Sequence, residues 1–249
     1  MWNEIPCPAV IAHRGDKCFA PENTLAAFIL AAEKGADAIE FDVKLTADGQ
    51  VIVLHDQTVD RTTNGTGNVS RLTSAALQDL DAGAWFSEQF RGEHIPTLEQ
   101  VFETLGKRLF LNVELTNYAS PGDDLVAKVV ELVKKHKLQD RTLFSSFFIR
   151  NLKMARMLLP EVPRGLLTMP GLMGFWGRTF EWRGDYFALH PALSGINPGL
   201  VQRVHAAGKR VHVWTVNSID DIKKMIGLEV DAIFTDDPGL ALHLLGKNK

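Results

Sequence analysis

The chain has 249 residues, of which 45% are hydrophobic and 23% are charged, and its formal net charge is −3, from 27 basic and 30 acidic side chains. This composition is ordinary for a globular protein with a substantial core. The balance of charge argues against nucleic acid or an anionic membrane surface as the main partner, because both would require a clustered excess of lysine and arginine.

Short apolar runs alternate along the chain with segments of helical periodicity. The runs predict strands over residues 9–13, 37–45, 51–55, 109–115, 142–146, 163–167, 185–190, 210–216 and 231–235. Continuous apolar runs of this kind are typical of strands that are covered on both faces, as in a parallel sheet. The segments between them predict helices over 22–34, 122–136, 197–207 and 218–226, and a last helix from 237.

The number of strand–helix units predicts the fold class. If the run 51–55 pairs with the preceding strand across the turn at Asp48-Gly49, it extends that strand, and eight βα units remain. Eight units in about 250 residues are typical of a TIM (β/α)₈ barrel, in the α/β class. An open doubly wound sheet is the alternative, but no glycine-rich phosphate loop follows the first strand.

The domain organisation follows from the same alternation. We expect a single TIM-barrel domain over residues 1–249, with a small inserted region over 57–96, after the second strand. This region interrupts the alternation, and Asn64-Gly65 in it is a strong turn signal. Long excursions of this kind often form lids or pocket walls.

The cysteines and the N-terminal residues favour a cytoplasmic protein. Cys7 and Cys18 are too few for a disulfide framework and have no zinc-binding spacing, so we expect free thiols in a reducing compartment. The first residues lack the basic and apolar regions of a secretory signal. No stretch reaches the roughly 20 apolar residues of a membrane span, so we expect no stable membrane insertion. No sequence pattern specifies an oligomeric state.

Three carboxylates are predicted to converge at one end of the barrel. Glu40 and Asp42 share one face of a strand, because side chains alternate along it, and Glu114 repeats the arrangement on the strand over 109–115. Such a group suits Ca²⁺ or Mg²⁺, which prefer oxygen ligands. A buried salt-bridge cluster with Arg14 is an equally good interpretation of the spacing alone.

Two histidines lie at strand ends, where the active sites of such barrels are found. His13 and His55 close their apolar runs and suit an acid–base pair near neutral pH. The planar guanidinium of Arg14 matches a phosphate. Trp214, near the end of the run 210–216, suits either a pocket wall or the core.

With these residues in place, the chain resembles the bacterial glycerophosphodiester phosphodiesterase family. The matching segments run almost from end to end, in the family's order and spacing: IAHRG, APENTLAAF, IEFDVKLTADGQVIVLHD, DRTTNGTG, LDAGAWF, IPTLEQV, NVEL, SSF, VWTVN and IFTDDP. The resemblance implies a TIM barrel with a small insertion. It also implies hydrolysis of a small-molecule glycerophosphodiester to glycerol 3-phosphate and an alcohol.

The resemblance implies roles for the metal-binding and proton-transferring residues. Glu40, Asp42 and Glu114 match the ligands of a divalent metal, usually Ca²⁺ or Mg²⁺. His13 and His55 match the family's acid–base pair. The nucleophile is then water, or the glycerol 2-hydroxyl by way of a cyclic phosphate.

The substrate-binding residues match with one departure. Arg14 matches the phosphate contact, and Trp214 matches an aromatic residue of the substrate pocket. The family commonly has Glu-x-Lys where this chain has Glu114-Leu115-Thr116. Thr116 can form a hydrogen bond to the substrate but brings no charge. We therefore expect weaker anion binding, a compensating cation from elsewhere, or a shifted substrate preference.

Two other functions compete with this one. A related metal-dependent phospholipase, acting on lipid phosphodiesters, would use much the same site, and the segment 170–183, PGLMGFWGRTFEWR, has apolar and basic residues suited to a membrane contact. A barrel that binds phosphodiesters but turns them over poorly is the other, because Thr116 stands where a charge is expected.

Overall fold

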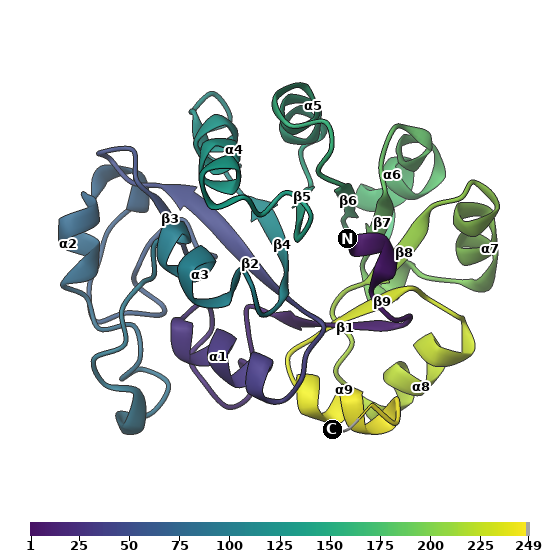
Figure 1. Ribbon diagram of the computed structural model, residues 1–249, viewed down its shortest axis with the longest axis horizontal. Coiled ribbons are helices and arrows are strands. Elements are labelled where there is room, and N and C mark those ends of the chain that lie inside the picture. The colour runs from purple at the N-terminus through teal and green to yellow at the C-terminus, as the bar shows by residue number, and fades with distance from the viewer. Residues whose placement is uncertain (248–249) are drawn as a thin grey trace.

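Eight parallel strands close into a barrel, seen end-on in Figure 1. The computed structural model describes residues 1–247. The strands are β1 (Ala9–His13), β2 (Ala38–Leu45), β3 (Val51–Val53), β4 (Phe110–Leu115), β5 (Thr142–Ser146), β6 (Arg164–Thr168), β7 (Ala188–Pro191), β8 (Arg210–Val213) and β9 (Ala232–Thr235). The neighbour order β1-β9-β8-β7-β6-β5-β4-β2 is closed by the pairing of β1 with β2. The predicted TIM barrel is therefore confirmed.

The short strand β3 runs antiparallel to β2, with Val53 opposite Val43 and Val51 opposite Leu45. The predicted pairing across Asp48-Gly49 is confirmed. Several predicted strands are too long, because the backbone leaves the sheet earlier than the apolar run ends. Thus β3 ends at Val53, and β8 ends at Val213. His55 consequently lies in the loop after β3, and Trp214 lies directly after β8, where it forms an isolated parallel bridge with Ala192.

Helices surround the barrel (Figure 1). They are α1 (Leu25–Glu33), α2 (Ser74–Gln78), α3 (Leu98–Leu105), α4 (Leu125–His136), α5 (Ile149–Leu158), α6 (Phe175–Thr179), α7 (Pro198–Ala206), α8 (Ile219–Gly227) and α9 (Pro238–Leu244). Side-chain oxygens cap several of their first turns, for example Thr24 on α1 and Ser218 on α8. Helices α3 and α5 were not predicted: α5 begins after Phe148, which offers no capping side chain, whereas α3 begins with a capping box at Thr97 that the sequence prediction did not use. No helix within residues 1–247 is long and apolar enough to cross a membrane.

The alternation of side chains along the strands separates the apolar shell from the site. Phe41 and Val43 of β2 face outward and pack in one buried cluster with Phe28 of α1, Val101 of α3 and Val129 of α4. Glu40 and Asp42, between them in the sequence, face the barrel interior, as predicted.

Mainly apolar side chains, together with the buried His212 that stacks on Trp2, fill the N-terminal half of the barrel interior. Trp2, Ile11, Leu143 and Phe234 belong to one buried cluster there. Ile11 lies two residues before His13 on the same face of β1, so His13 lies directly above this cluster. The barrel interior is therefore closely packed in its N-terminal half and polar at the C-terminal ends of its strands.

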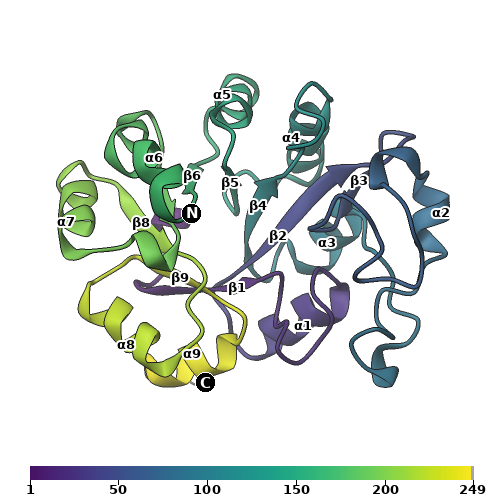
Figure 2. The same ribbon diagram turned by 180° about the vertical axis from the view of Figure 1, so that it is seen from behind.

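The segment between β3 and α3 departs from the regular alternation. It contains α2 and short 3₁₀ helices at Val69–Arg71 and Glu88–Phe90, and it lies beside α1 and α3 at one side of the barrel (Figure 2). A small apolar cluster of its own includes Val59 and Leu77. The single domain over 1–249, with its insertion over 57–96, stays a prediction, and residues 248–249 lie outside the described part.

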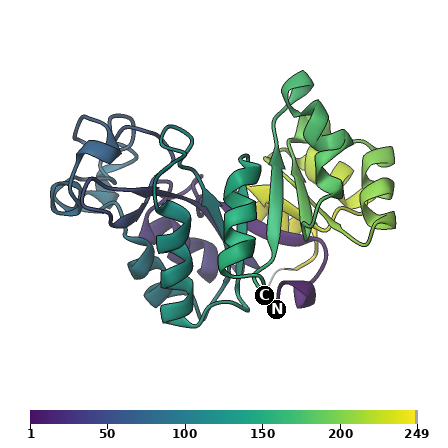
Figure 3. The same ribbon diagram turned by 90° about the horizontal axis from the view of Figure 1, so that it is seen from above.

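The two ends of the barrel are distinct in Figure 3. Both termini lie at one end, and the segment that contains α6, drawn in green, projects at the other. This segment also contains 3₁₀ helices at Gly171–Gly174 and Glu181–Arg183.

Candidate active site

A cavity of about 180 Å³ opens at the C-terminal ends of the strands. Seven of the eight predicted site residues line it: His13, Arg14, Glu40, Asp42, His55, Glu114 and Trp214. The remaining wall is formed by Asn112, Ser145, Phe147, Leu167 and Phe234. The eighth predicted residue, Thr116, lies outside the cavity lining. Barrel closure thus brings together residues from both ends of the sequence.

The three predicted carboxylates meet in this cavity. Asp42 of β2 and Glu114 of β4 are register partners across the sheet, and Glu40 lies two residues before Asp42. One oxygen from each of the three lies within 4.8 Å of the others. Burial, followed by the charges of Asp42 and Glu114, raises the pKa of the Glu40 carboxyl well above its usual range. Burial and Asp42 likewise raise the pKa of Glu114 to about 8.

Arg14 compensates only part of this negative charge. Its Nε lies 3.5 Å from Oδ2 of Asp42, and its terminal nitrogen donates to Oε1 of Glu22 at 2.8 Å. Burial raises the pKa of Asp42, but Arg14 and the other positive and hydrogen-bonding groups around it together lower it below its usual value. Glu40 receives the backbone N–H of Arg14 at 3.2 Å, and Glu114 receives the hydroxyl of Tyr118 at 2.8 Å. The carboxylates could therefore hold a metal ion.

His13 is held by a carboxylate from the far end of the sequence. Its Nδ1 lies 2.7 Å from Oδ1 of Asp236, and its Nε2 lies 4.0 Å from Oε2 of Glu40. A carboxylate only accepts hydrogen bonds, so Nδ1 carries the proton and Nε2 faces the site. Burial lowers the pKa of His13, and the hydrogen bond to Asp236 opposes this effect. Lys17, 3.1 Å from Asp236, completes the arrangement.

His55 has the same kind of partner, although it is more exposed than His13. Its Nδ1 lies 2.6 Å from Oδ1 of Asp56. Arg61 binds Asp56 through Nε at 2.7 Å and binds both oxygens of Glu22 at 2.8 and 2.9 Å. Glu22 in turn holds Arg14, so a chain of ion pairs joins the His55 loop to Arg14. Burial raises the pKa of Glu22, but the two arginines lower it to about 2.

Thr116 binds a lysine from the neighbouring strand. Its hydroxyl donates to the carbonyl of Val43 at 2.8 Å. The Nζ of Lys44 donates to the Thr116 hydroxyl oxygen at 3.0 Å and to its carbonyl at 3.2 Å. Lys44 is buried and follows Glu40 and Asp42 on the inward face of β2, so it brings a positive charge next to the carboxylates.

Aromatic rings form one wall of the cavity. Trp214 donates its indole N–H to the carbonyl of His190 at 2.9 Å, which fixes the ring at the cavity edge. Phe147 packs edge-on against Trp214, with ring centroids 5.7 Å apart. Trp214 thus lines the cavity and also packs against the buried cluster that contains Ile11 and Phe234, so its role in substrate binding stays a prediction.

Sequence reasoning did not assign five residues that support the site: Glu22, Lys44, Asp56, Arg61 and Asp236. The sequence contained signals for two of these residues. Asp56 follows His55 directly, and Asp236 is the first residue after the apolar strand β9. Charged residues at these positions of a barrel point to the active-site end. Arg61, in the loop after β3, carried no comparable signal.

Comparisons with known proteins agree with this geometry. Residues 13–240 match the family model described as the glycerophosphoryl diester phosphodiesterase family. A glycerophosphodiester phosphodiesterase of Caldanaerobacter subterraneus is 42% identical over 239 residues, which cover 96% of this chain and 98% of that protein.

Solved structures agree as well. A phosphodiesterase of Oleispira antarctica, in complex with the product sn-glycerol-3-phosphate, has a TM-score of 0.88 and 35% identity, over 96% of this chain and 97% of the other. A glycerophosphodiester phosphodiesterase of Agrobacterium tumefaciens has a TM-score of 0.80 and 32% identity, over 95% and 99%. The resemblance expected from the sequence is thus confirmed, and the chain belongs to the glycerophosphoryl diester phosphodiesterase family.

Proposed function

We propose that this chain hydrolyses a glycerophosphodiester to glycerol 3-phosphate and an alcohol, with a divalent metal and a pair of histidines. The observation that carries the proposal is the cavity in which three carboxylates face His13 and His55, each with a carboxylate on Nδ1. Such pairs leave Nε2 of both rings for proton transfer. The free thiols Cys7 and Cys18 support action in the cytoplasm.

Glu40, Asp42 and Glu114 would hold the metal. Burial and the neighbouring carboxylates raise the pKa values of Glu40 and Glu114, so the cations around them offset only part of the cost of their negative charge. This favours a metal site over a salt-bridge cluster with Arg14, and the all-oxygen ligand set suits Ca²⁺ or Mg²⁺. When bound, the metal supplies positive charge that binds phosphoryl oxygens and stabilises the transition state.

Arg14 binds the phosphate beside these carboxylates. Within residues 1–247, Glu22 accepts one hydrogen bond from the Arg14 guanidinium, which has five donors. The Nε of Arg14 is buried and faces Asp42, so the donors left for phosphate oxygens are those of the terminal nitrogens that do not bind Glu22. Glu22 and Asp42 hold the guanidinium between them, so little side-chain entropy is lost when the phosphate binds.

The histidines move the protons. One Nε2 accepts the proton of the nucleophile, which is water or the glycerol 2-hydroxyl, as the new P–O bond forms. The other histidine donates its proton to the departing alkoxide as the P–O bond to the alcohol breaks. When the 2-hydroxyl is the nucleophile, this step gives a cyclic phosphate, and water then adds to its phosphorus as the P–O bond to the 2-oxygen breaks, which yields glycerol 3-phosphate. Asp236 and Asp56 keep both rings oriented and stabilise each imidazolium when it forms.

Lys44 supplies the charge that the family commonly has at the position of Thr116. Of the three expectations for Thr116, a compensating cation has structural support, because the Thr116 hydroxyl and carbonyl hold the Lys44 ammonium. Thr116 is therefore proposed to bind the substrate indirectly, through Lys44. Trp214 lines the substrate side of the cavity.

Release of glycerol 3-phosphate from glycerophosphocholine tests the proposal. We expect release that stops with chelator and returns with Ca²⁺ or Mg²⁺. His13→Ala and His55→Ala should each lower kcat about 10²- to 10⁴-fold, with a much smaller effect on binding. Near-normal turnover in either variant would refute the histidine pair. Activity on vesicles alone would favour a phospholipase, and binding without product would favour a non-catalytic barrel.

A further inference from the structure

A second hollow, of about 440 Å³, adjoins the active-site cavity. The two share Phe147 and Leu167 as lining residues, so one opens beside the other. The other side chains of the hollow are mainly aromatic or sulfur-containing and include Tyr118, Phe148, Met169 and Met173. Glu181 is the one charged residue in its lining.

An aromatic wall runs from the cavity into this hollow. Phe147 packs edge-on against Trp214 on one side and against Tyr118 on the other, with centroids 5.7 and 5.9 Å apart. Tyr118 then packs against Phe148 at 4.7 Å. The Tyr118 hydroxyl donates to Glu114, so one wall of the hollow contacts the carboxylates that are proposed to hold the metal.

The outer rim of the hollow exposes apolar side chains to solvent. Met173 is 79% exposed, and its neighbour Leu172 is 90% exposed. Trp176 of α6 is 65% exposed and packs against Phe180 at 5.1 Å. Met173 lines the hollow itself, and Leu172, Trp176 and Phe180 lie in the same segment. Exposed apolar side chains gathered in one segment are typical of a binding site, because their hydration is unfavourable.

We propose that this hollow binds the alcohol part of the substrate, and that this alcohol carries an alkyl or acyl chain. The inference rests on the proposed function. The glycerol hydroxyls match the polar side of the cavity, where Asn112 and Ser145 lie. With phosphorus at the carboxylates, the other ester arm leaves past Phe147 and Leu167 into an apolar channel, which a chain fills by burying apolar surface.

A cationic alcohol such as choline fits the hollow less well. Recognition of a quaternary ammonium uses the faces of several rings. Here Tyr118 and Phe148 pack tightly against each other at 4.7 Å, and the hollow continues outward to Met173 and not to a closed cage. The shape and composition therefore favour a chain.

The test measures kcat/KM of the full chain, with metal, on glycerophosphocholine and on the glycerophosphodiesters of methanol, butanol and octanol, with the octyl diester assayed both below and above its aggregation concentration. We expect at least an about 10-fold increase from the methyl to the octyl diester, since each buried methylene contributes several-fold. Met173→Ser should lower the octyl-to-methyl ratio at least about threefold. Met157→Ser is the matched control, because Met157 is 83% exposed on α5 and lines a different hollow.

The outcomes separate the failure of this inference from the failure of the proposed function. No glycerol 3-phosphate from any diester would refute the function itself. Hydrolysis without dependence on chain length would overturn only the alkyl site. A preference for glycerophosphocholine that Glu181→Gln abolishes would overturn it in favour of a cation site. Chain dependence only above aggregation would overturn it in favour of a membrane contact.

Discussion

Replacing Asp236 with asparagine removes the charge beside His13 and retains the shape of the side chain. Asp236 accepts from Nδ1 of His13 at 2.7 Å and from Asn217 at 2.8 Å, and Lys17 lies 3.1 Å away. An amide can still accept a hydrogen bond, but it stabilises an imidazolium less than a carboxylate does. We therefore predict that Asp236 contributes to catalysis by orienting His13 and stabilising its protonated form.

The size of the effect follows from the ionisation of Asp236. Burial raises its pKa, but the hydrogen bond and charge of His13, with Lys17, lower it from 3.8 to about 2. This lowering corresponds to roughly 2 kcal/mol, or about 30- to 60-fold in an equilibrium constant. Since Lys17 contributes part of this energy, we expect kcat/KM to fall about 10- to 60-fold.

The pH profile gives a second readout. Burial lowers the pKa of His13, and the Asp236 hydrogen bond raises it in opposition. Without the carboxylate the pKa of His13 falls further, so the limb of the pH–rate profile that belongs to His13 should move to lower pH. Release of glycerol 3-phosphate, measured from about pH 5 to pH 9 with metal present, reports both quantities.

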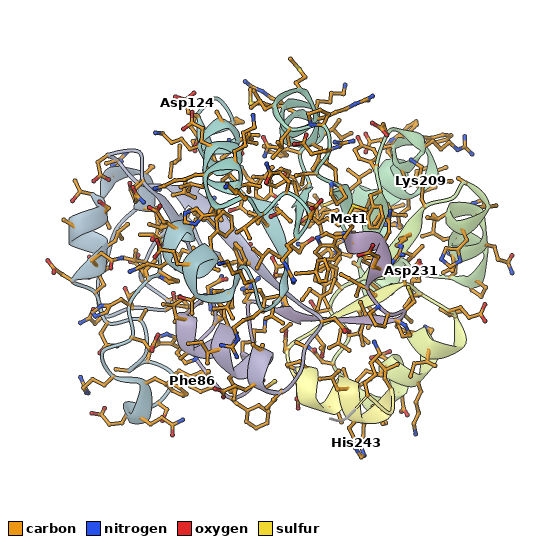
Figure 4. The ribbon with its side chains drawn as sticks, viewed as in Figure 1. Met1, Phe86, Asp124, Lys209, Asp231 and His243 are labelled. Atoms are coloured by element: carbon orange, nitrogen blue, oxygen red, sulfur yellow. The ribbon has the colours of Figure 1, made fainter. Side chains whose placement is uncertain are left out.

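The chain contains a matched control for this variant. Asp231 precedes the same strand β9 at its opposite end and binds His205 at 2.7 Å, outside the cavity. Asp231 is labelled in Figure 4. Asp231→Asn should leave the pH–rate profile unchanged. If Asp236→Asn retains kcat/KM within about threefold, with an unmoved profile, the positioning role is wrong.

Two further predictions concern the charges of the site. In chelator, Tm should fall as the pH rises from about 5 to 8. Burial and Asp42 raise the pKa of Glu114 from 4.5 to about 8. The folded state therefore gains stability from the protonated Glu114 carboxyl at low pH, and this stability is lost as the carboxyl ionises. Added Ca²⁺ or Mg²⁺ should restore Tm at pH 8, and equal Tm values at both pH values in chelator would contradict the argument. Lys44→Met should weaken glycerol 3-phosphate binding about 10-fold by calorimetry, as expected for a lost charged contact. Thr116→Lys should restore it in that background, and unchanged affinity of Lys44→Met would show that Lys44 does not act on the phosphate.

Local periodicity was enough for the barrel and for the carboxylates. Side chains two residues apart on a strand share a face, so Glu40 and Asp42 had to lie together whatever the rest of the fold. The C-terminal ends of parallel barrel strands meet at one edge, which brought Glu114 and His13 to the same place. These properties depend on residues that are near in sequence or on strand direction, and the sequence displays both.

Tertiary structure alone decided how each site residue is supported. His13 and Asp236 are 223 residues apart and meet because β1 pairs with β9 when the barrel closes. Lys44 and Thr116, 72 residues apart, meet through the register of β2 with β4. Sequence patterns contain neither strand register nor the burial that shifts a pKa, because both arise only when distant segments pack and exclude water.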